Sequence, residues 1–271
     1  MKNINSFFIA IFIYIFIQGV ALWISAGGYG IKKGIVEKVD EGEIQPVTEN
    51  PRDPYSAVYL FVMIIIATVF LFMLLKYGMD LIIKILIFSG FMVGLYFTFS
   101  NIFGCVGGFL LAISLLLIFI WKRDNIFIIN LVLLFVIPGI GSLIGASLSL
   151  IPALIFIVAL SFYDIIAVFG TKHMIKIAEE SRGKIPLMFA IPVGDRYLGL
   201  GTGDMALPVV FTVSMLRDYS IEYSIISAIG GLIGLIILLN YILNKKGLAL
   251  PALPPITVGL LSGFIIALLS F

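Results

Sequence analysis

The stretch GLGTGDMALPVV, residues 199–210, places a carboxylate, Asp204, near the start of an apolar run that continues to Leu216. This run is apolar enough to enter a lipid bilayer, where a charged side chain is costly unless it is paired, hydrated or neutralised. An acid in such a position is therefore a candidate functional residue. We therefore ask whether another acid in the sequence can pair with Asp204.

The composition is typical of a membrane protein. Of the 271 residues, 61% are hydrophobic and 12% are charged, and the mean hydropathy is +1.19. Soluble domains carry about twice this share of charge, so we expect a multi-pass protein of the cell membrane, surrounded by the lipid bilayer. The net charge of +2 does not favour a nucleic-acid partner. A single cysteine, Cys105, and a single histidine, His173, predict neither a disulfide nor a metal site, and we expect no cofactor.

The apolar runs predict an all-α polytopic fold with nine transmembrane helices. The runs 81–121 and 126–170 measure about 60 and about 65 Å at 1.5 Å per residue, so each has to cross the bilayer twice. We expect the first to turn near residues 100–108 and the second between Pro138 and Ser149. The other five predicted spans cover residues 7–25, 55–75, 198–216, 223–243 and about 247–270.

These spans divide the chain into three parts. Residues 1–175 form a part with six helices, residues 176–197 a cytoplasmic connecting loop, and residues 198–271 a part with three helices. The connections on the side of the N-terminus carry twelve lysines and arginines, and those on the other side carry five. The positive-inside rule therefore predicts a cytoplasmic N-terminus and a C-terminus outside.

The partner of Asp204 is predicted to be Asp164. Asp164 lies six residues before the end of the sixth span, and Asp204 lies six residues after the start of the seventh. Both acids should therefore lie about 9 Å below the same, cytoplasmic, surface. Consecutive antiparallel helices are usually neighbours, so the two carboxyl groups can face each other.

Two carboxyl groups within hydrogen-bonding reach in a poorly hydrated site cannot both be ionised, so the pair shares one proton. Such a pair can act as an aspartic protease: one acid takes a proton from water, and the other donates a proton to the scissile carbonyl. Geometry alone leaves other roles open, because proton relays and ion sites also use intramembrane acids. The alternative function is therefore a proton- or cation-coupled transporter, and a further one is an interaction protein without catalysis.

Glycines and prolines accompany the acids. Gly199, Gly201 and Gly203 weaken helix formation before Asp204 and allow backbone to approach closely. In LALPALPPI, residues 248–256, three prolines predict a stretch of non-helical backbone at the depth of the aspartates. No internal repeat is visible in the order of the spans, which disfavours transporters built from inverted repeats.

Three motifs occur together along the chain: YDIIAVFG with Tyr163 and Asp164, GTGD ending at Asp204, and PAL at residues 251–253. Their order resembles that of presenilins and signal peptide peptidases, the GxGD intramembrane aspartyl proteases, and the chain looks most like an archaeal homologue. The resemblance implies a presenilin-like fold of nine spans, peptide-bond hydrolysis within transmembrane-helix substrates, and no metal.

The same resemblance implies roles for single residues. Asp164 and Asp204 would be the catalytic pair. The residues that would line the active site are Tyr163, Gly201, Thr202, Gly203, Pro251, Ala252 and Leu253. Thr202 departs from the pattern, because presenilins usually have leucine at this position. Homo-oligomerisation stays open.

The connection between the sixth and seventh spans predicts two features. Charged and apolar residues alternate after Thr171 in a way that favours an amphipathic helix ending at Gly183. The apolar segment Ile185 to Ile191 is interrupted by Pro186, and we expect it to pair as a strand with an unwound substrate.

Overall fold

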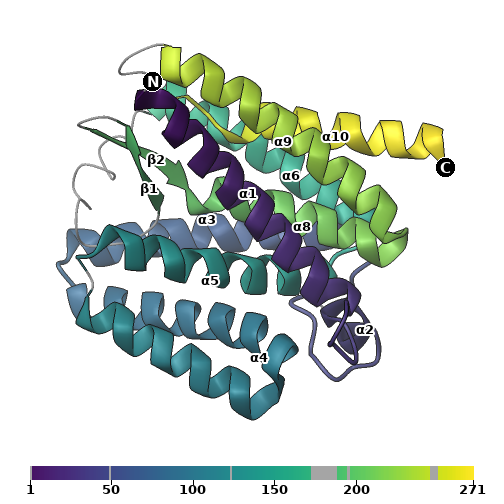
Figure 1. Cartoon of the computed structure of the whole chain (residues 1–271), viewed down its shortest axis with the longest axis horizontal. Coiled ribbons are helices and arrows are strands. Elements are labelled where there is room, and N and C mark those ends of the chain that lie inside the picture. Colours follow the sequence, from purple (N-terminus) through teal and green to yellow (C-terminus); the bar gives the residue numbers. More distant parts are fainter. Residues whose placement is uncertain (1, 49, 123, 172–187, 194–195, 245–249) are drawn as a thin grey trace.

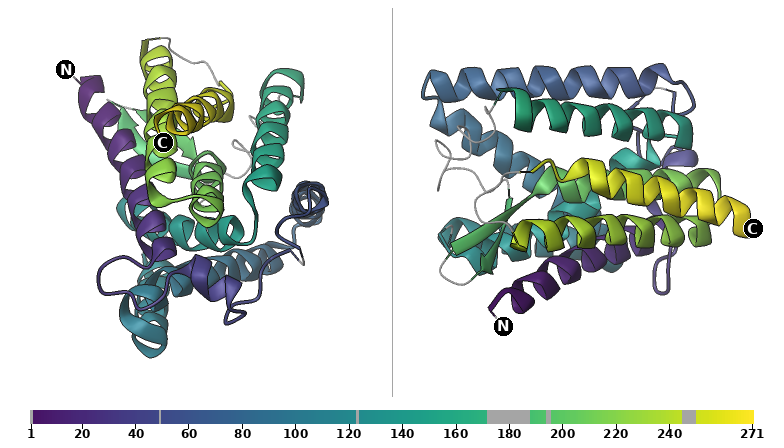
Figure 2. Two further views of the ribbon diagram at one scale, coloured as in Figure 1. Left: turned by 90° about the vertical axis from the view of Figure 1, so that its right-hand side faces the viewer. Right: turned by 90° about the horizontal axis from the view of Figure 1, so that it is seen from above.

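The computed structural model describes residues 2–48, 50–122, 124–171, 188–193, 196–244 and 250–271 (Figure 1). Its long helices share one general direction, and loops lie at the two ends of the bundle (Figures 1 and 2). The elements are α1 (Lys2–Ala26), α2 (Ile35–Asp40), α3 (Tyr55–Lys76), α4 (Asp80–Trp121), α5 (Ile126–Ala146), α6 (Leu150–Ile166), a π-helical turn (Ala167–Thr171), β1 (Met188–Val193), β2 (Arg196–Gly201), α8 (Thr202–Asp218), α9 (Ile221–Asn244) and α10 (Leu253–Ser270).

Seven of the described helices are long and apolar enough to span a membrane, namely α1, α3, α4, α5, α6, α9 and α10. Helix α4, with 42 residues, is broken at Gly104, whose φ of 77° is a left-handed conformation that glycine adopts easily. The two arms of α4 run back along each other (Figure 1), as expected from the length of the run. An added Cβ at Gly108 would stand 2.3 Å from the backbone of Ser100, so the arms pack closely beside the turn.

The second expected turn is also present. Helix α5 continues through Pro138 to Ala146, and α6 begins at Leu150, so the chain turns at the late end of the predicted interval. Helix α8 has 17 residues and lies at the centre of the bundle, where it contacts α1, α5, α6 and α9. Its residues from Pro208 to Met215 are all buried.

The structure corrects three predictions. The fold is not entirely helical, because β1 and β2 form an antiparallel hairpin that pairs Met188 with Gly201 and Val193 with Arg196. The seventh span therefore begins at Thr202 and not at residue 198. The last helix begins at Leu253, so only part of the proline-rich stretch is non-helical. The predicted amphipathic helix up to Gly183 lies outside the described residues.

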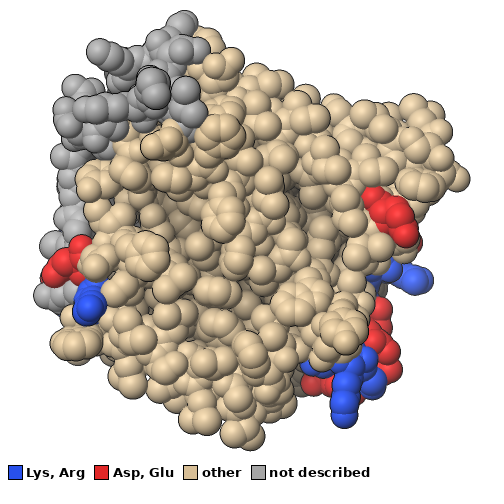
Figure 3. All heavy atoms as spheres, viewed as in Figure 1, with Lys and Arg blue, Asp and Glu red and all other residues tan. Residues whose placement is uncertain are grey.

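The polar segment between α1 and α3 packs against the end of the bundle that lies opposite the hairpin. Arg217 at the end of α8 pairs with Asp40 of α2, and Lys38 donates a hydrogen bond to Asn101 at the turn of α4, at 2.7 Å. The two chain ends lie at opposite ends of the bundle (Figure 1). On the face drawn in Figure 3, the charged side chains gather at these two ends, with an apolar belt between them.

Candidate active site

Asp164 and Asp204 lie on neighbouring helices. Asp164 is in the last turn of α6, and Asp204 is the third residue of α8. Helix α6 packs against both α8 and α10. Both aspartate residues are half-buried, and they are near enough for the charge of Asp164 to act on Asp204. The structure therefore brings together the two acids that the sequence paired, although Asp204 lies closer to its helix start than expected because residues 198–201 are a strand.

The first turn of α10 faces Asp164. The backbone amide of Leu253 donates a hydrogen bond to Oδ2 of Asp164 at 3.1 Å, and Ala252, the residue before it, is the N-cap of α10. A helix N-terminus carries unpaired amides and a partial positive charge, both of which stabilise a carboxylate. Pro254 and Pro255 have no amide hydrogen, so the first turn leaves few donors besides those that Asp164 uses.

A single glycine shapes the surroundings of Asp204. Gly201 is the N-cap residue of α8, and the Asp204 carboxyl group lies beside it. An added Cβ at Gly201 would lie 2.7 Å from Oδ2 of Asp204, so this carboxyl position requires glycine here. At Gly203 an added Cβ would meet no atom within 4 Å.

The other predicted lining residues lie around this pair in different ways. Pro251 and Ala252 are half-buried, and Leu253 is buried beside Asp164. Thr202 is the first residue of α8 and is half-buried. Tyr163 is partly exposed, and its ring packs edge-on against Phe61 of α3, with 6.4 Å between ring centroids. Tyr163 therefore occupies the contact between α3 and α6.

Sequence reasoning missed the hairpin that precedes Asp204. In RYLGLG, residues 196–201, the prediction ends the connecting loop at residue 197 and starts a helix at residue 198, although two glycines in six residues are unusual for a helix. Two runs of strand-like residues separated by Gly194 and Asp195 were the available signal for a hairpin. Of the segment Ile185 to Ile191, residues 188–191 belong to β1, and residues 185–187 lie outside the described part of the chain.

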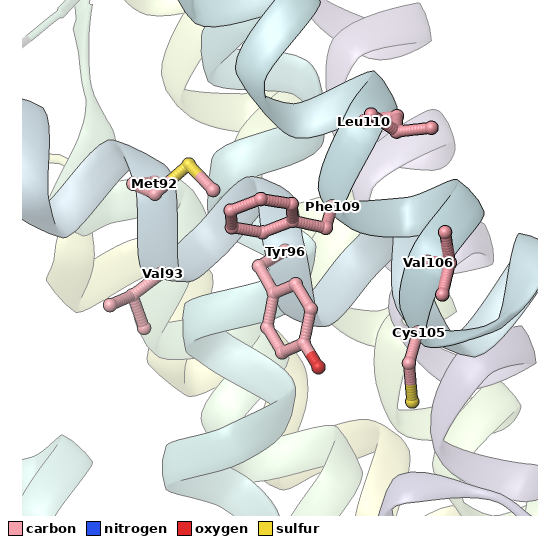
Figure 4. A pocket seen from close by; sticks show the side chains of 7 residues that line it. All are labelled: Met92, Val93, Tyr96, Cys105, Val106, Phe109 and Leu110. Atoms are coloured by element: carbon pink, nitrogen blue, oxygen red, sulfur yellow. The ribbon is translucent and has the colours of Figure 1, made fainter.

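A groove of about 560 Å³ lies elsewhere, between the two arms of α4 (Figure 4). Its lining residues are Met92, Val93, Tyr96, Cys105, Val106, Phe109 and Leu110. None of them belongs to α6, α8 or α10, so this groove is not part of the candidate active site. Among the described residues, no three His, Cys, Asp or Glu side chains come together as metal ligands.

Comparison with known proteins agrees with this fold. Two solved structures, each described as a presenilin family intramembrane aspartate protease, are similar along the chain. The first, in a C222 crystal form, has a TM-score of 0.71 at 20% sequence identity, and the match covers 100% of both chains. The second, in a P2 form, has a TM-score of 0.68 at 23% identity and covers 96% of both chains. No curated protein sequence matches.

The similarity also appears at the level of sequence families. Residues 32–199 match the family described as signal-peptide peptidase, presenilin aspartyl protease. The matched range contains Asp164 and ends before Asp204, whereas the similar structures also cover the C-terminal part. The family match spans more than half of the chain. The chain therefore belongs to the signal-peptide peptidase and presenilin family of aspartyl proteases.

Proposed function

We propose that this protein is an intramembrane aspartyl protease that hydrolyses peptide bonds within single-span transmembrane substrates, with Asp164 and Asp204 as its catalytic pair. The observation that carries the proposal is that Asp164 of α6, bonded to the start of α10, lies near enough to Asp204 of α8 for their charges to interact. Family membership supports an aspartic peptidase of this type, and no finding supports the alternative of a transporter.

The two acids differ in their hydrogen bonds, which suggests their roles. Asp164 accepts the Leu253 amide at the N-terminus of α10, so negative charge is better stabilised on Asp164. Asp164 then takes a proton from the attacking water, while the protonated Asp204 donates to the carbonyl oxygen of the scissile bond. The roles exchange when the amine leaves, and no metal or cofactor takes part.

The proposal includes nine membrane crossings. The two arms of α4 count as two crossings and α8 as one, which together with α1, α3, α5, α6, α9 and α10 makes nine. The excess of lysine and arginine on the side of the hairpin supports a cytoplasmic N-terminus and an outer C-terminus in the cell membrane. The active site would then face the cytoplasmic side of the bilayer. Homo-oligomers remain compatible with this arrangement.

The hairpin supports a way to present the scissile bond. A helical peptide bond is enclosed by its own hydrogen bonds, so the substrate has to unwind before hydrolysis. Residues Val193 and Arg196 close the hairpin with two residues between them, so the backbone groups of Tyr197 and Gly199 point away from β1. This outer edge of β2 leads into Asp204 and is suited to add a substrate strand.

Hydrolysis of a single-span peptide by the purified protein in detergent tests the proposal. Asp164→Asn and Asp204→Asn should each abolish cleavage, because neither variant can share a proton between two carboxyl groups. The wild-type rate should follow a bell-shaped pH profile, since one acid has to be protonated and the other ionised. Cleavage that persists in both variants, or a rate that rises monotonically with pH, would refute the paired-acid mechanism.

A further inference from the structure

The outer edge of β1 is held by a side chain of α5. Asn130 donates a hydrogen bond from its amide nitrogen to the carbonyl oxygen of Ala190 at 2.9 Å, and the Ala190 amide donates one to the Asn130 side-chain oxygen at 3.1 Å. An asparagine side chain carries the same donor and acceptor as a peptide group. Asn130 therefore pairs with β1 in the way that one residue of a neighbouring strand would.

The register of the hairpin agrees with this pairing. Ala190 lies opposite Gly199, at a position where the backbone groups of both residues point away from the hairpin. The Asn130 side chain forms its hydrogen bonds with the outward-pointing amide and carbonyl of Ala190. Two residues further along, the carbonyl of Pro192 also points outward and accepts a hydrogen bond from the Ser6 hydroxyl of α1. The edge of β1 is thus occupied from two helices.

Asn130 affects the position of Asp204 indirectly, through three successive contacts. Asn130 fixes Ala190 of β1, and Ala190 is opposite Gly199 of β2. Two residues later, Gly201 lies against the Asp204 carboxyl group, because an added Cβ at Gly201 would stand 2.7 Å from Oδ2 of Asp204. A hairpin that could slide or tilt against α5 would change the position of Gly201, and with it the surroundings of Asp204.

We propose that Asn130 is a positioning residue of the active site. Its side-chain amide pairs with β1 as one residue of a strand would, and so sets the position of the hairpin relative to Asp204. Because it occupies the edge of β1, it restricts the addition of a substrate strand to the edge of β2. The proposal rests on the proteolytic function proposed above. The hydrogen bonds of the Asn130 side chain go to Ala190, so Asn130 acts through the backbone of β1 and β2.

The test compares two asparagines of the same helix region. Asn130→Leu keeps a similar side-chain volume and removes both hydrogen bonds to Ala190. The matched control, Asn125→Ala, removes the cap of α5, where Asn125 accepts a hydrogen bond from the Phe127 amide at 2.9 Å. Two measurements are made on each full-length protein in detergent: deuterium uptake by residues 188–193, and the cleavage positions in a single-span peptide determined by mass spectrometry.

Asn130→Leu should raise the exchange rate of residues 188–193 on the order of tenfold, the effect of losing one or two hydrogen bonds. It should also spread cleavage over additional positions and lower kcat/KM by a similar factor. A partly unfolded sample would lose rate without moving the cleavage positions, so this shift separates positioning from general destabilisation. Asn125→Ala should leave both the hairpin exchange and the cleavage positions unchanged.

The proposal is overturned if exchange at residues 188–193 is unaltered in Asn130→Leu, if the cleavage positions stay the same, or if Asn125→Ala produces the same changes. A wild-type protein that does not cleave the peptide would instead overturn the proposed function. In that case the exchange measurement alone decides whether Asn130 holds β1.

Discussion

At the scale of single residues, Gly201 and Gly203 have different surroundings, although both precede Asp204 in the same GTGD motif. The position of a Cβ on Gly201 is taken by the Asp204 carboxyl group, whereas that of Gly203 is open space. The backbone of Gly201, with φ −61° and ψ 139°, is accessible to alanine. Position 201 therefore requires glycine because there is no space for a side chain beside the carboxylate, and not because the backbone is strained.

Gly201→Ala should turn the Asp204 side chain away and lower kcat by about tenfold or more, since small displacements of a catalytic group are costly. Because the clash involves only the end of one side chain, the thermal midpoint should change little. The measurement is steady-state cleavage of a single-span peptide alongside a thermal unfolding curve.

Gly203→Ala is the informative comparison. Its added methyl group leaves Asp204 in place and extends into the open site, so any loss should appear in KM and not in kcat. Equal effects of the two substitutions on kcat would contradict the distinction drawn from the structure.

At the scale of elements, α10 depends on α9 for its position. Gly230 and Gly259 face each other, and an added Cβ on Gly259 would stand 2.2 Å from the Gly230 carbonyl oxygen. Small residues at such a crossing let two membrane helices approach to backbone contact. The start of α10, where the Leu253 amide donates to Asp164, is held by this contact between the two helices.

Gly259→Ala should therefore force α9 and α10 apart and destabilise the protein by about 1–3 kcal/mol, as overpacking does in other tightly packed interiors. Differential scanning fluorimetry in detergent should show a lower midpoint, accompanied by loss of peptide cleavage. Gly19→Ala serves as control, because an added Cβ there meets nothing within 4 Å and alanine favours the helix. A midpoint for Gly259→Ala equal to that of the control would show that the crossing is adaptable.

At the scale of the whole molecule, the charged ends and apolar belt predict how the protein sits in the membrane. The segment between α1 and α3 lies at one end with Arg217, and the connection between α4 and α5 lies at the other end with the hairpin (Figure 1). The proposed orientation puts the first end outside the cell and the second in the cytoplasm.

Cysteine labelling tests this orientation in a Cys105→Ser background. A membrane-impermeant maleimide applied to intact cells should react with Glu43→Cys in the outer segment. Lys122→Cys, after α4, should react only once the cells are opened. The reverse pattern would establish an inverted topology, with the active site toward the outer surface.

Much of the molecule could be predicted because hydropathy is a local property. A run of apolar residues has to be helical in lipid and has to turn when it exceeds the bilayer thickness, so the break at Gly104 and the order of the spans followed from length and composition. The short strands were missed because six-residue segments next to a helix start carry little periodicity, and their pairing depends on a partner strand.

The sequence by itself determined that this is a multi-pass helical membrane protein with two acids at matching places on consecutive spans. Only the tertiary structure decided what surrounds those acids. The amide of Leu253 that supports Asp164 lies 89 residues away along the chain, and Asn130 is 60 residues from the strand that it holds. Such partners are chosen by how helices pack, and helix packing depends on the shapes of whole faces, which no local pattern contains.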